Sequence, residues 1–207
     1  MPLTQLLSDI RVLPVLTVDS PDTAVALVSA LVRGGAVGVE ITLRTPAALA
    51  AIAAVRRAHP SLAVGAGTVR TPDDLDAVKM LGAAFAVSPG LTRTLADHAH
   101  GCGVPLLAGV ATASEAMRGI ELGLDCFKLF PARAVNGLEL LRAFAAPLAG
   151  VGFCPTGGVD WTTYVDYLAL PNVLCVAGSW MAPAEWIAAG DWDRVSASMA
   201  KALSRQQ

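Results

Sequence analysis

One lysine of this chain is placed to act as a nucleophile rather than as a surface charge. Of the three lysines, Lys79 and Lys201 fall on amphipathic helical stretches, where solvation explains them. Lys128 lies instead within the apolar run CFKLFP, residues 126–131, which is typical of a buried strand. An unpaired ammonium is costly to bury, whereas a neutral amine attacks carbonyl groups and forms Schiff bases. Lys128 is therefore predicted to be catalytic, with a buried lysine held by a carboxylate as the alternative.

A second apolar run, GVEITL from Gly38, carries polar side chains at alternate positions. Glu40, Thr42 and Arg44 share one face of a strand, and the apolar residues between them share the other. A carboxylate near a Schiff base can remove and return protons, and an arginine fork suits a substrate carboxylate. We predict these roles for Glu40 and Arg44. The alternatives are a buried ion pair and a salt-bridged loop arginine.

Three glycine-containing strand ends fit a substrate with two anionic groups. Residues 65–68, GAGT, let the backbone approach closely and end in the hydroxyl of Thr68. Residues 156–158, TGG, and residues 178–179, GS, follow the last two apolar runs. In a barrel, backbone amides and small residues at those two places form the usual phosphate site. Thr156, Gly157, Gly158 and Ser179 are therefore expected at the phosphate end.

Eight apolar runs alternate with helical patterns along the whole chain. The runs are RVLPVLTV from Arg11, GVEITL from Gly38, AVGAGT from Ala63, AAFAVSP from Ala83, VPLLAGV from Val104, CFKLFP from Cys126, GFCPTGG from Gly152 and VLCVAGS from Val173. Helix-start signals between them are Ser20-Pro21, Thr45-Pro46, Thr71-Pro72, Thr92, Thr112 with Glu115, Asn136 and Asp160. This order predicts an α/β fold, a single (β/α)8 barrel over residues 1–207, with a doubly wound sheet as the alternative.

The barrel would bring the chemical groups together. Strands two and six of a closed eight-stranded barrel lie opposite one another, so Glu40 and Lys128 would project toward each other across the interior. Active sites of such barrels form at the carboxyl ends of the strands. We therefore expect the site there.

The composition argues against nucleic acid and membranes as binding partners. The chain is 54% hydrophobic and 15% charged, which fits a sheet covered on both faces. Its net charge of −2 leaves no basic footprint for nucleic acid or an anionic membrane surface. The opening residues show no secretory signal, and no apolar stretch is long enough for a membrane span. We expect a cytoplasmic protein that binds a small molecule.

The cysteines and histidines are not expected to carry the chemistry. The four cysteines are widely spaced without a CxxC pair, so they are interpreted as reduced core thiols rather than as metal ligands or disulfides: Cys102, Cys126, Cys154 and Cys175. The three histidines lie in helical segments and are interpreted as solvated: His59, His98 and His100.

Six stretches of the sequence closely resemble one enzyme family. They are VEITLRT (39–45), VGAGTV (64–69), VSPG (87–90), FKLFPA (127–132), FCPTGG (153–158) and LCVAGSW (174–180). They occur in order across nearly the whole chain and are similar to the 2-keto-3-deoxy-6-phosphogluconate (KDPG) aldolases, which often also cleave 4-hydroxy-2-oxoglutarate (KHG). The chain departs from the family at Arg133, where FPAR replaces FPAE, and at Ala108, where AGVAT replaces PGIST or PGVAT.

The resemblance implies a role for each candidate residue. Lys128 would form the Schiff base, Glu40 would transfer protons, and Arg44 with Thr68 would hold the pyruvyl carboxylate. The pocket would be shaped by Phe130 and Pro89, and the phosphate would contact Thr156, Gly157, Gly158 and Ser179. The family also implies a homotrimer that needs no metal and no cofactor.

The sequence thus predicts a class I aldolase of the Entner-Doudoroff type, which cleaves KDPG to pyruvate and glyceraldehyde 3-phosphate. It would also cleave KHG to pyruvate and glyoxylate. Three alternatives stay open: an aldolase for the 6-phosphogalactonate epimer, a non-covalent sugar-phosphate isomerase or epimerase, and a catalytically silent binding or assembly barrel. Arg133 leaves the fine substrate preference undecided.

Overall fold

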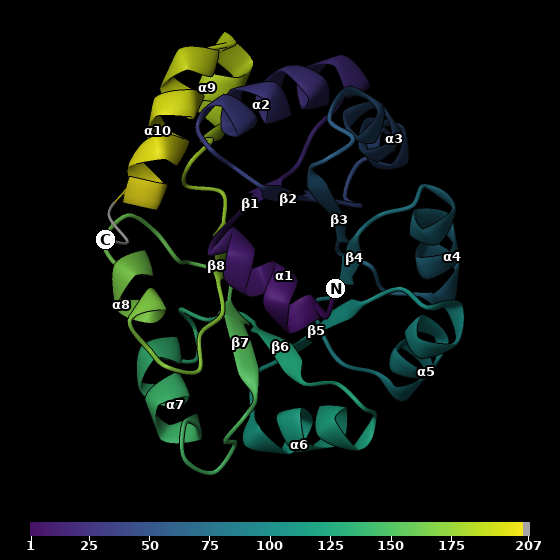
Figure 1. The fold of residues 1–207 in the computed structure, drawn as a ribbon, viewed down its shortest axis with the longest axis vertical. Coiled ribbons are helices and arrows are strands. Elements are labelled where there is room, and N and C mark those ends of the chain that lie inside the picture. Colours follow the sequence, from purple (N-terminus) through teal and green to yellow (C-terminus); the bar gives the residue numbers. More distant parts are fainter. Residues whose placement is uncertain (205–207) are drawn as a thin grey trace.

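The computed structural model describes residues 1–204 and contains a parallel eight-stranded barrel (Figure 1). The strands run in the order β7-β6-β5-β4-β3-β2-β1-β8, and parallel bridges Phe153↔Val173 and Thr156↔Ala177 close the gap between the first and last of them. The bounds are β1 Val12–Leu16, β2 Gly38–Thr42, β3 Ala63–Gly67, β4 Phe85–Val87, β5 Leu106–Val110, β6 Cys126–Leu129, β7 Gly152–Pro155 and β8 Val176–Gly178. All eight predicted strands are confirmed, and the doubly wound alternative is wrong.

The buried apolar residues of the strands divide between two separate clusters, one against the helices and one inside the barrel. Val39 and Ile41 of β2, like Phe127 and Leu129 of β6, pack against the surrounding helices. Cys126 belongs to the interior cluster, which fills the barrel at the end covered by the first helix. The interior cluster comprises Leu7, Ile10, Leu13, Phe85, Val87, Leu107, Cys126, Cys154, Cys175 and Ala177. Strand alternation therefore turns Glu40 and Lys128 inward, as predicted.

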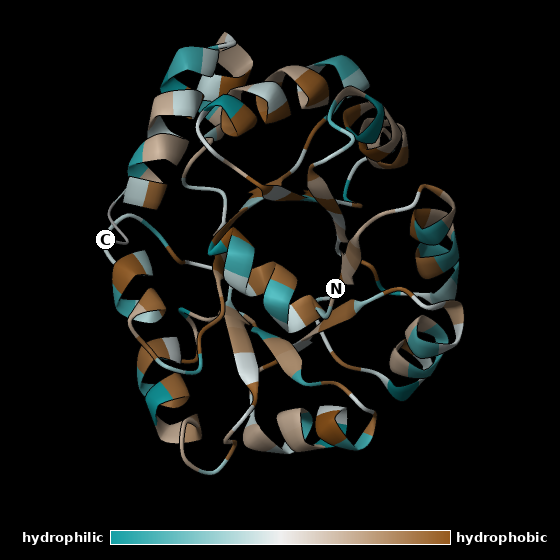
Figure 2. Ribbon diagram, in the orientation of Figure 1, coloured by the Kyte–Doolittle hydropathy of each residue, from teal (hydrophilic) through white to brown (hydrophobic). Residues whose placement is uncertain are grey.

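Helices surround the barrel, with polar residues toward solvent (Figure 2). Their bounds are α1 Leu3–Ile10, α2 Pro21–Arg33, α3 Ala48–Ala58, α4 Pro72–Met80, α5 Arg93–Cys102, α6 Ala113–Glu121, α7 Gly137–Phe144, α8 Tyr164–Leu168, α9 Ala184–Ala189 and α10 Trp192–Ser204. Four predicted N-caps are confirmed, because the side chains of Ser20, Thr71, Thr92 and Thr112 accept hydrogen bonds from helix N–H groups. Glu115 completes the predicted capping box.

Two predicted helix starts need correction, and a third, at Asn136, is in place but lacks its side-chain cap. Helix α3 begins at Ala48, because the Thr45 hydroxyl donates to the carbonyl of Val18 instead of capping a helix. Asn136 precedes α7 but has a left-handed backbone and makes no side-chain cap. Asp160 accepts hydrogen bonds from a turn at residues 162–163, and α8 begins only at Tyr164.

Helix α1 was not predicted, and it covers the amino-terminal end of the barrel (Figure 1). Its residues Leu7 and Ile10 are buried and belong to the interior cluster. The end of the barrel opposite the carboxyl ends of the strands is therefore filled with apolar side chains. A barrel active site is therefore expected at the other end, where the strands have their carboxyl ends.

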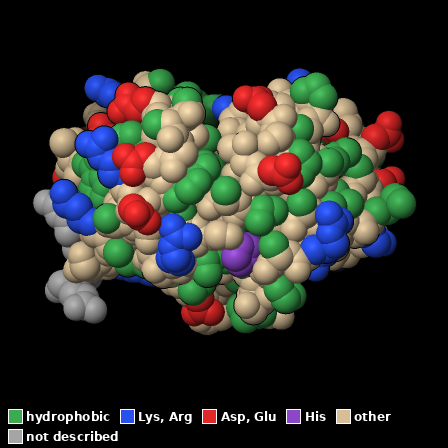
Figure 3. All heavy atoms as spheres, turned by 90° about the horizontal axis from the view of Figure 1, so that it is seen from above, with side chains coloured by type: hydrophobic (Ala, Val, Ile, Leu, Met, Phe, Trp, Pro, Cys, Tyr) green, Lys and Arg blue, Asp and Glu red, His purple; other side chains and the backbone are tan. Residues whose placement is uncertain are grey.

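The predicted core thiols are confirmed for three cysteines. Cys126, Cys154 and Cys175 are buried and free, whereas Cys102 is only half-buried, at the end of α5. His100 is exposed as predicted, but His59 and His98 are half-buried and bond to Ser29 and Asp76. Among the described residues, no helix is long and apolar enough to cross a membrane. On the face in Figure 3, basic and acidic side chains are interspersed.

Candidate active site

A cavity of about 490 Å³ opens at the carboxyl ends of β1, β6, β7 and β8. Its wall is formed by Val15, Leu16, Thr17, Arg44, Lys128, Phe130, Thr156, Gly157, Gly158, Val159, Gly178, Ser179, Ala182, Pro183, Ala184 and Ile187. Seven of the ten predicted site residues are among them. The cavity volume is ordinary for a small-molecule site.

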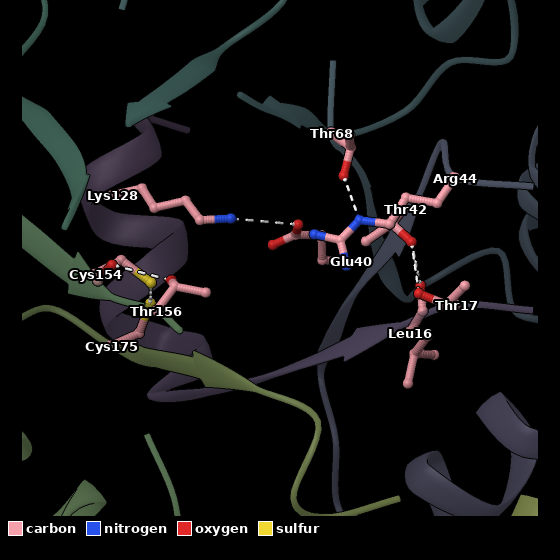
Figure 4. Close-up of polar contacts among 10 residues, drawn as sticks. All are labelled: Leu16, Thr17, Glu40, Thr42, Arg44, Thr68, Lys128, Cys154, Thr156 and Cys175. Carbon is pink, nitrogen blue, oxygen red and sulfur yellow. Dashed lines mark hydrogen bonds and ion pairs between the residues drawn. The ribbon is translucent and has the colours of Figure 1, made fainter. Parts of the chain in front are cut away.

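Lys128 and Glu40 face each other across the barrel interior (Figure 4). The Lys128 Nζ lies 3.8 Å from Glu40 Oε1, and the two side chains are only 6% and 1% exposed. Lys128 reaches the cavity wall, while Glu40 lies deeper and does not line it. The predicted approach of Glu40 on the second strand to Lys128 on the sixth is therefore found in the structure. Through one water molecule, Glu40 could exchange protons with a molecule bound to Lys128.

The carboxylate of Glu40 has little else to stabilise its charge. Neither of its oxygens has a hydrogen-bond partner among the described residues. Burial raises the pKa of Glu40 above its ordinary value of 4.5, and the nearby charges of Lys128 and Arg44 lower it to a smaller extent. A carboxyl group whose proton affinity is raised in this way is suited to hold and release a proton during catalysis.

Gly67 makes the room that Glu40 occupies. A Cβ atom at this position would lie 2.1 Å from Glu40 Oε1 and 2.8 Å from its Cγ. Such contacts are far shorter than any side chain accepts. The glycine of the third strand is therefore needed for the position of the carboxylate on the second.

Arg44 and Thr68 lie together beside the pair. The Arg44 Nε donates to Thr68 Oγ1 at 3.1 Å, and Thr68 has φ +60°, which is uncommon for a threonine (Figure 4). The hydroxyls of Thr17 and Thr42 are 2.9 Å apart and complete this polar side of the site. Because Arg44 is exposed and lines the cavity, its remaining donors can reach a bound anion.

The opposite wall of the cavity is built from glycines. Gly157 and Gly158 have φ values of +90° and +81°, a backbone region that favours glycine. With Thr156 and Ser179 they form a concave wall that exposes main chain and small hydroxyls. Such surroundings suit a phosphate group.

Of the two residues predicted to shape the pocket, Phe130 lines the cavity and Pro89 does not. The Lys128 Nζ lies 5.1 Å from the centre of the Phe130 ring, which lines the cavity as expected. Pro89 is exposed after β4 and does not line the cavity. Its carbonyl instead lies against Gly109, where a Cβ atom would approach to 2.2 Å. The structure therefore does not bring Pro89 to the site.

Several wall residues escaped the sequence analysis. Thr17 directly follows the first strand, and a polar residue at a strand end could have signalled it. Pro183 and Ile187 come from the segment around α9, which gave no such signal. Of the two departures, Ala108 is buried in the helix-facing cluster. The stem of Arg133 packs beside Gly158 of the glycine-containing wall.

A closed parallel barrel with a buried lysine and glutamate below its carboxyl-end cavity defines a class I aldolase, in which lysine forms a covalent imine. A family model described as "KDPG and KHG aldolase" matches residues 3–198. The chain belongs to this family of carbon-carbon lyases.

Relatives of known structure or sequence agree with this assignment. The chain is 48% identical to the KHG/KDPG aldolase of Escherichia coli over 185 residues, covering 89% of this chain and 87% of that one. It is 45% identical to the 2-dehydro-3-deoxy-phosphogluconate aldolase of Pseudomonas aeruginosa, covering 94% and 89%. The KDPG aldolase of Legionella pneumophila, captured with pyruvate as a covalent carbinolamine, superposes with a TM-score of 0.93 at 39% identity and covers 96% of both chains.

Proposed function

We propose that this protein cleaves KDPG to pyruvate and glyceraldehyde 3-phosphate through a Schiff base on Lys128, and that it also cleaves KHG to pyruvate and glyoxylate. The observation that carries the proposal is the buried approach of Lys128 Nζ to Glu40 Oε1 at 3.8 Å, at the floor of the cavity. A buried pair contributes little net stability, so chemistry explains its presence better.

The reaction begins when the neutral amine of Lys128 attacks the C2 ketone of the substrate. Loss of water gives an iminium ion, which accepts the electron pair of the C3–C4 bond when that bond breaks. Glu40, acting through a water molecule, takes the proton of the C4 hydroxyl, and the aldehyde leaves. The same proton then returns to C3 of the enamine, and hydrolysis releases pyruvate and the free lysine.

The surrounding side chains orient the substrate along the cavity. Arg44 and Thr68 hold the carboxylate next to the ketone, on the side of β2 and β3. The wall at Thr156, Gly157, Gly158 and Ser179 receives the phosphate at the other end. Two anion sites on opposite sides of Lys128 fit a keto acid that carries a phosphate at its far end.

Coupled assays of pyruvate release test this substrate assignment. We expect turnover of KDPG by the purified protein and its loss in Lys128→Ala, with the variant's circular dichroism unchanged. Faster turnover of the galactonate epimer would instead make that epimer the substrate. Conversion of a sugar phosphate without pyruvate release would favour the isomerase alternative.

Two further properties are proposed from the family. The homotrimer rests on the family resemblance, and light scattering after gel filtration tests it by giving three times the monomer mass of 21.2 kDa. A cytoplasmic location fits an enzyme whose substrate is a phosphorylated intermediate. Fractionation of cells with an antibody against the protein would test the location.

A further inference from the structure

Helices α4 and α5 lie side by side on the outside of the barrel, away from the aldolase cavity (Figure 1). Neither helix contributes a residue to the cavity wall. The outward-facing surface between these helices nevertheless carries three side chains that are common metal ligands. They are Asp76 of α4 and His98 and Cys102 of α5.

The three ligand atoms are close together. The Asp76 Oδ1 lies 2.8 Å from His98 Nε2, and one ligand atom from each of Asp76 and His98 lies within 4.8 Å of the Cys102 sulfur. His98 and Cys102 are four residues apart on one helix, which places them on the same face one turn apart. Asp76 completes the group from the neighbouring helix. Among the described residues this is the one set of three such groups within that distance.

The spacing agrees with a tetrahedral metal site after small side-chain rotations. Bond lengths to zinc of about 2.0–2.3 Å place neighbouring ligand atoms about 3.3–3.6 Å apart. The Cys102 thiol makes only a 3.5 Å hydrogen bond to the carbonyl of Ala99, and a change of its χ1 angle releases it. The side chains of Asp76 and His98 are 57% and 34% exposed, so they have room to adjust.

We propose that Asp76, His98 and Cys102 bind a zinc-class divalent cation, with water as the fourth ligand. Thiolate and imidazole ligands select zinc, cobalt or copper over magnesium and calcium. The half-buried Cys102 can be reached by an ion, unlike the three cysteines inside the barrel. The metal would join α4 to α5 and stabilise the folded protein by mass action, without taking part in aldol cleavage.

Cobalt titration tests the proposal on the full chain after dialysis against a chelator. We expect one cobalt per chain, with a thiolate-to-cobalt band in the near ultraviolet and strong visible bands of a tetrahedral ion. Zinc should displace the cobalt and raise the Tm. Cys102→Ser should lose the thiolate band, and His98→Ala and Asp76→Asn should each weaken binding at least tenfold.

His100→Ala is the matched control, because His100 is exposed on the same helix but lies outside the group. Its cobalt spectrum and the zinc-induced rise in Tm should equal those of the unaltered protein. The proposal is overturned if the unaltered protein shows no thiolate band, if the band survives in Cys102→Ser, or if His100→Ala weakens binding as much as His98→Ala. Circular dichroism of each variant checks folding, since none of the altered side chains is fully buried.

Discussion

Replacing Gly67 by alanine should disable proton transfer while leaving the lysine in place. The new Cβ atom would lie 2.1 Å from Glu40 Oε1, whereas ordinary contact begins at 3.4 Å. The carboxylate must therefore move by more than about 1 Å, and a displacement of that size can lower a rate by about 100-fold. Loss of general acid-base catalysis has a similar effect, about 100-fold or more.

The assay for Gly67→Ala combines steady-state cleavage with imine trapping. We expect kcat for KDPG cleavage to fall about 100-fold, close to the value for Glu40→Gln, while borohydride still traps pyruvate on Lys128. The double variant should be no slower than either single variant, because both remove the same function. Overpacking should also cost about 1–3 kcal/mol of stability.

Gly90→Ala is the matched control, because a Cβ atom there meets nothing within 4 Å. It should cleave at the normal rate. A Gly67→Ala enzyme with normal kcat would refute the assignment of proton transfer to Glu40. Equal losses in both alanine variants would show that the effect is not specific to the carboxylate.

Three other predictions follow from the charges around the cavity. Because burial raises the pKa of Glu40 in the folded state, stability should fall as pH rises from about 4.5 through that raised pKa, and urea titrations should show that Glu40→Gln abolishes this fall. Arg44→Ala should lower kcat/KM for KDPG by roughly 10- to 100-fold through loss of a charge-assisted contact; an unchanged kcat/KM would contradict the assigned role. Arg133→Glu should raise KM for the phosphorylated substrate roughly two- to fivefold at low salt, but not for the unphosphorylated analogue, and 0.5 M salt should remove the difference.

The strands and the reacting pair could be predicted because both depend on local pattern. Each apolar run between turn signals became a strand, and alternation along β2 and β6 fixed which side chains point inward. Once the barrel is closed, opposition of Glu40 and Lys128 follows from strand number alone. The position of Arg44 could also be predicted, because it follows the carboxyl end of β2, where the cavity opens.

Other features depend on contacts between distant segments and could not be predicted. Helix α1 is fixed by burying Leu7 and Ile10 against the barrel floor, and a short terminal stretch does not reveal such packing. Thr45 caps no helix, because its hydroxyl donates to the carbonyl of Val18, which comes from a distant part of the chain. Cys102 and Asp76 are separated by 25 intervening residues, so only the packing of two helices brings them together.

The most direct test of the account is to incubate the protein with pyruvate and borohydride, digest it with trypsin and locate the reduced adduct by mass spectrometry. We expect the adduct on the peptide of residues 119–133, in which Lys128 is the only lysine and alkylation blocks cleavage after it. Lys128→Ala should give no adduct. Absence of any adduct in the unaltered protein, or its spread over Lys79 and Lys201, would contradict the Schiff-base mechanism.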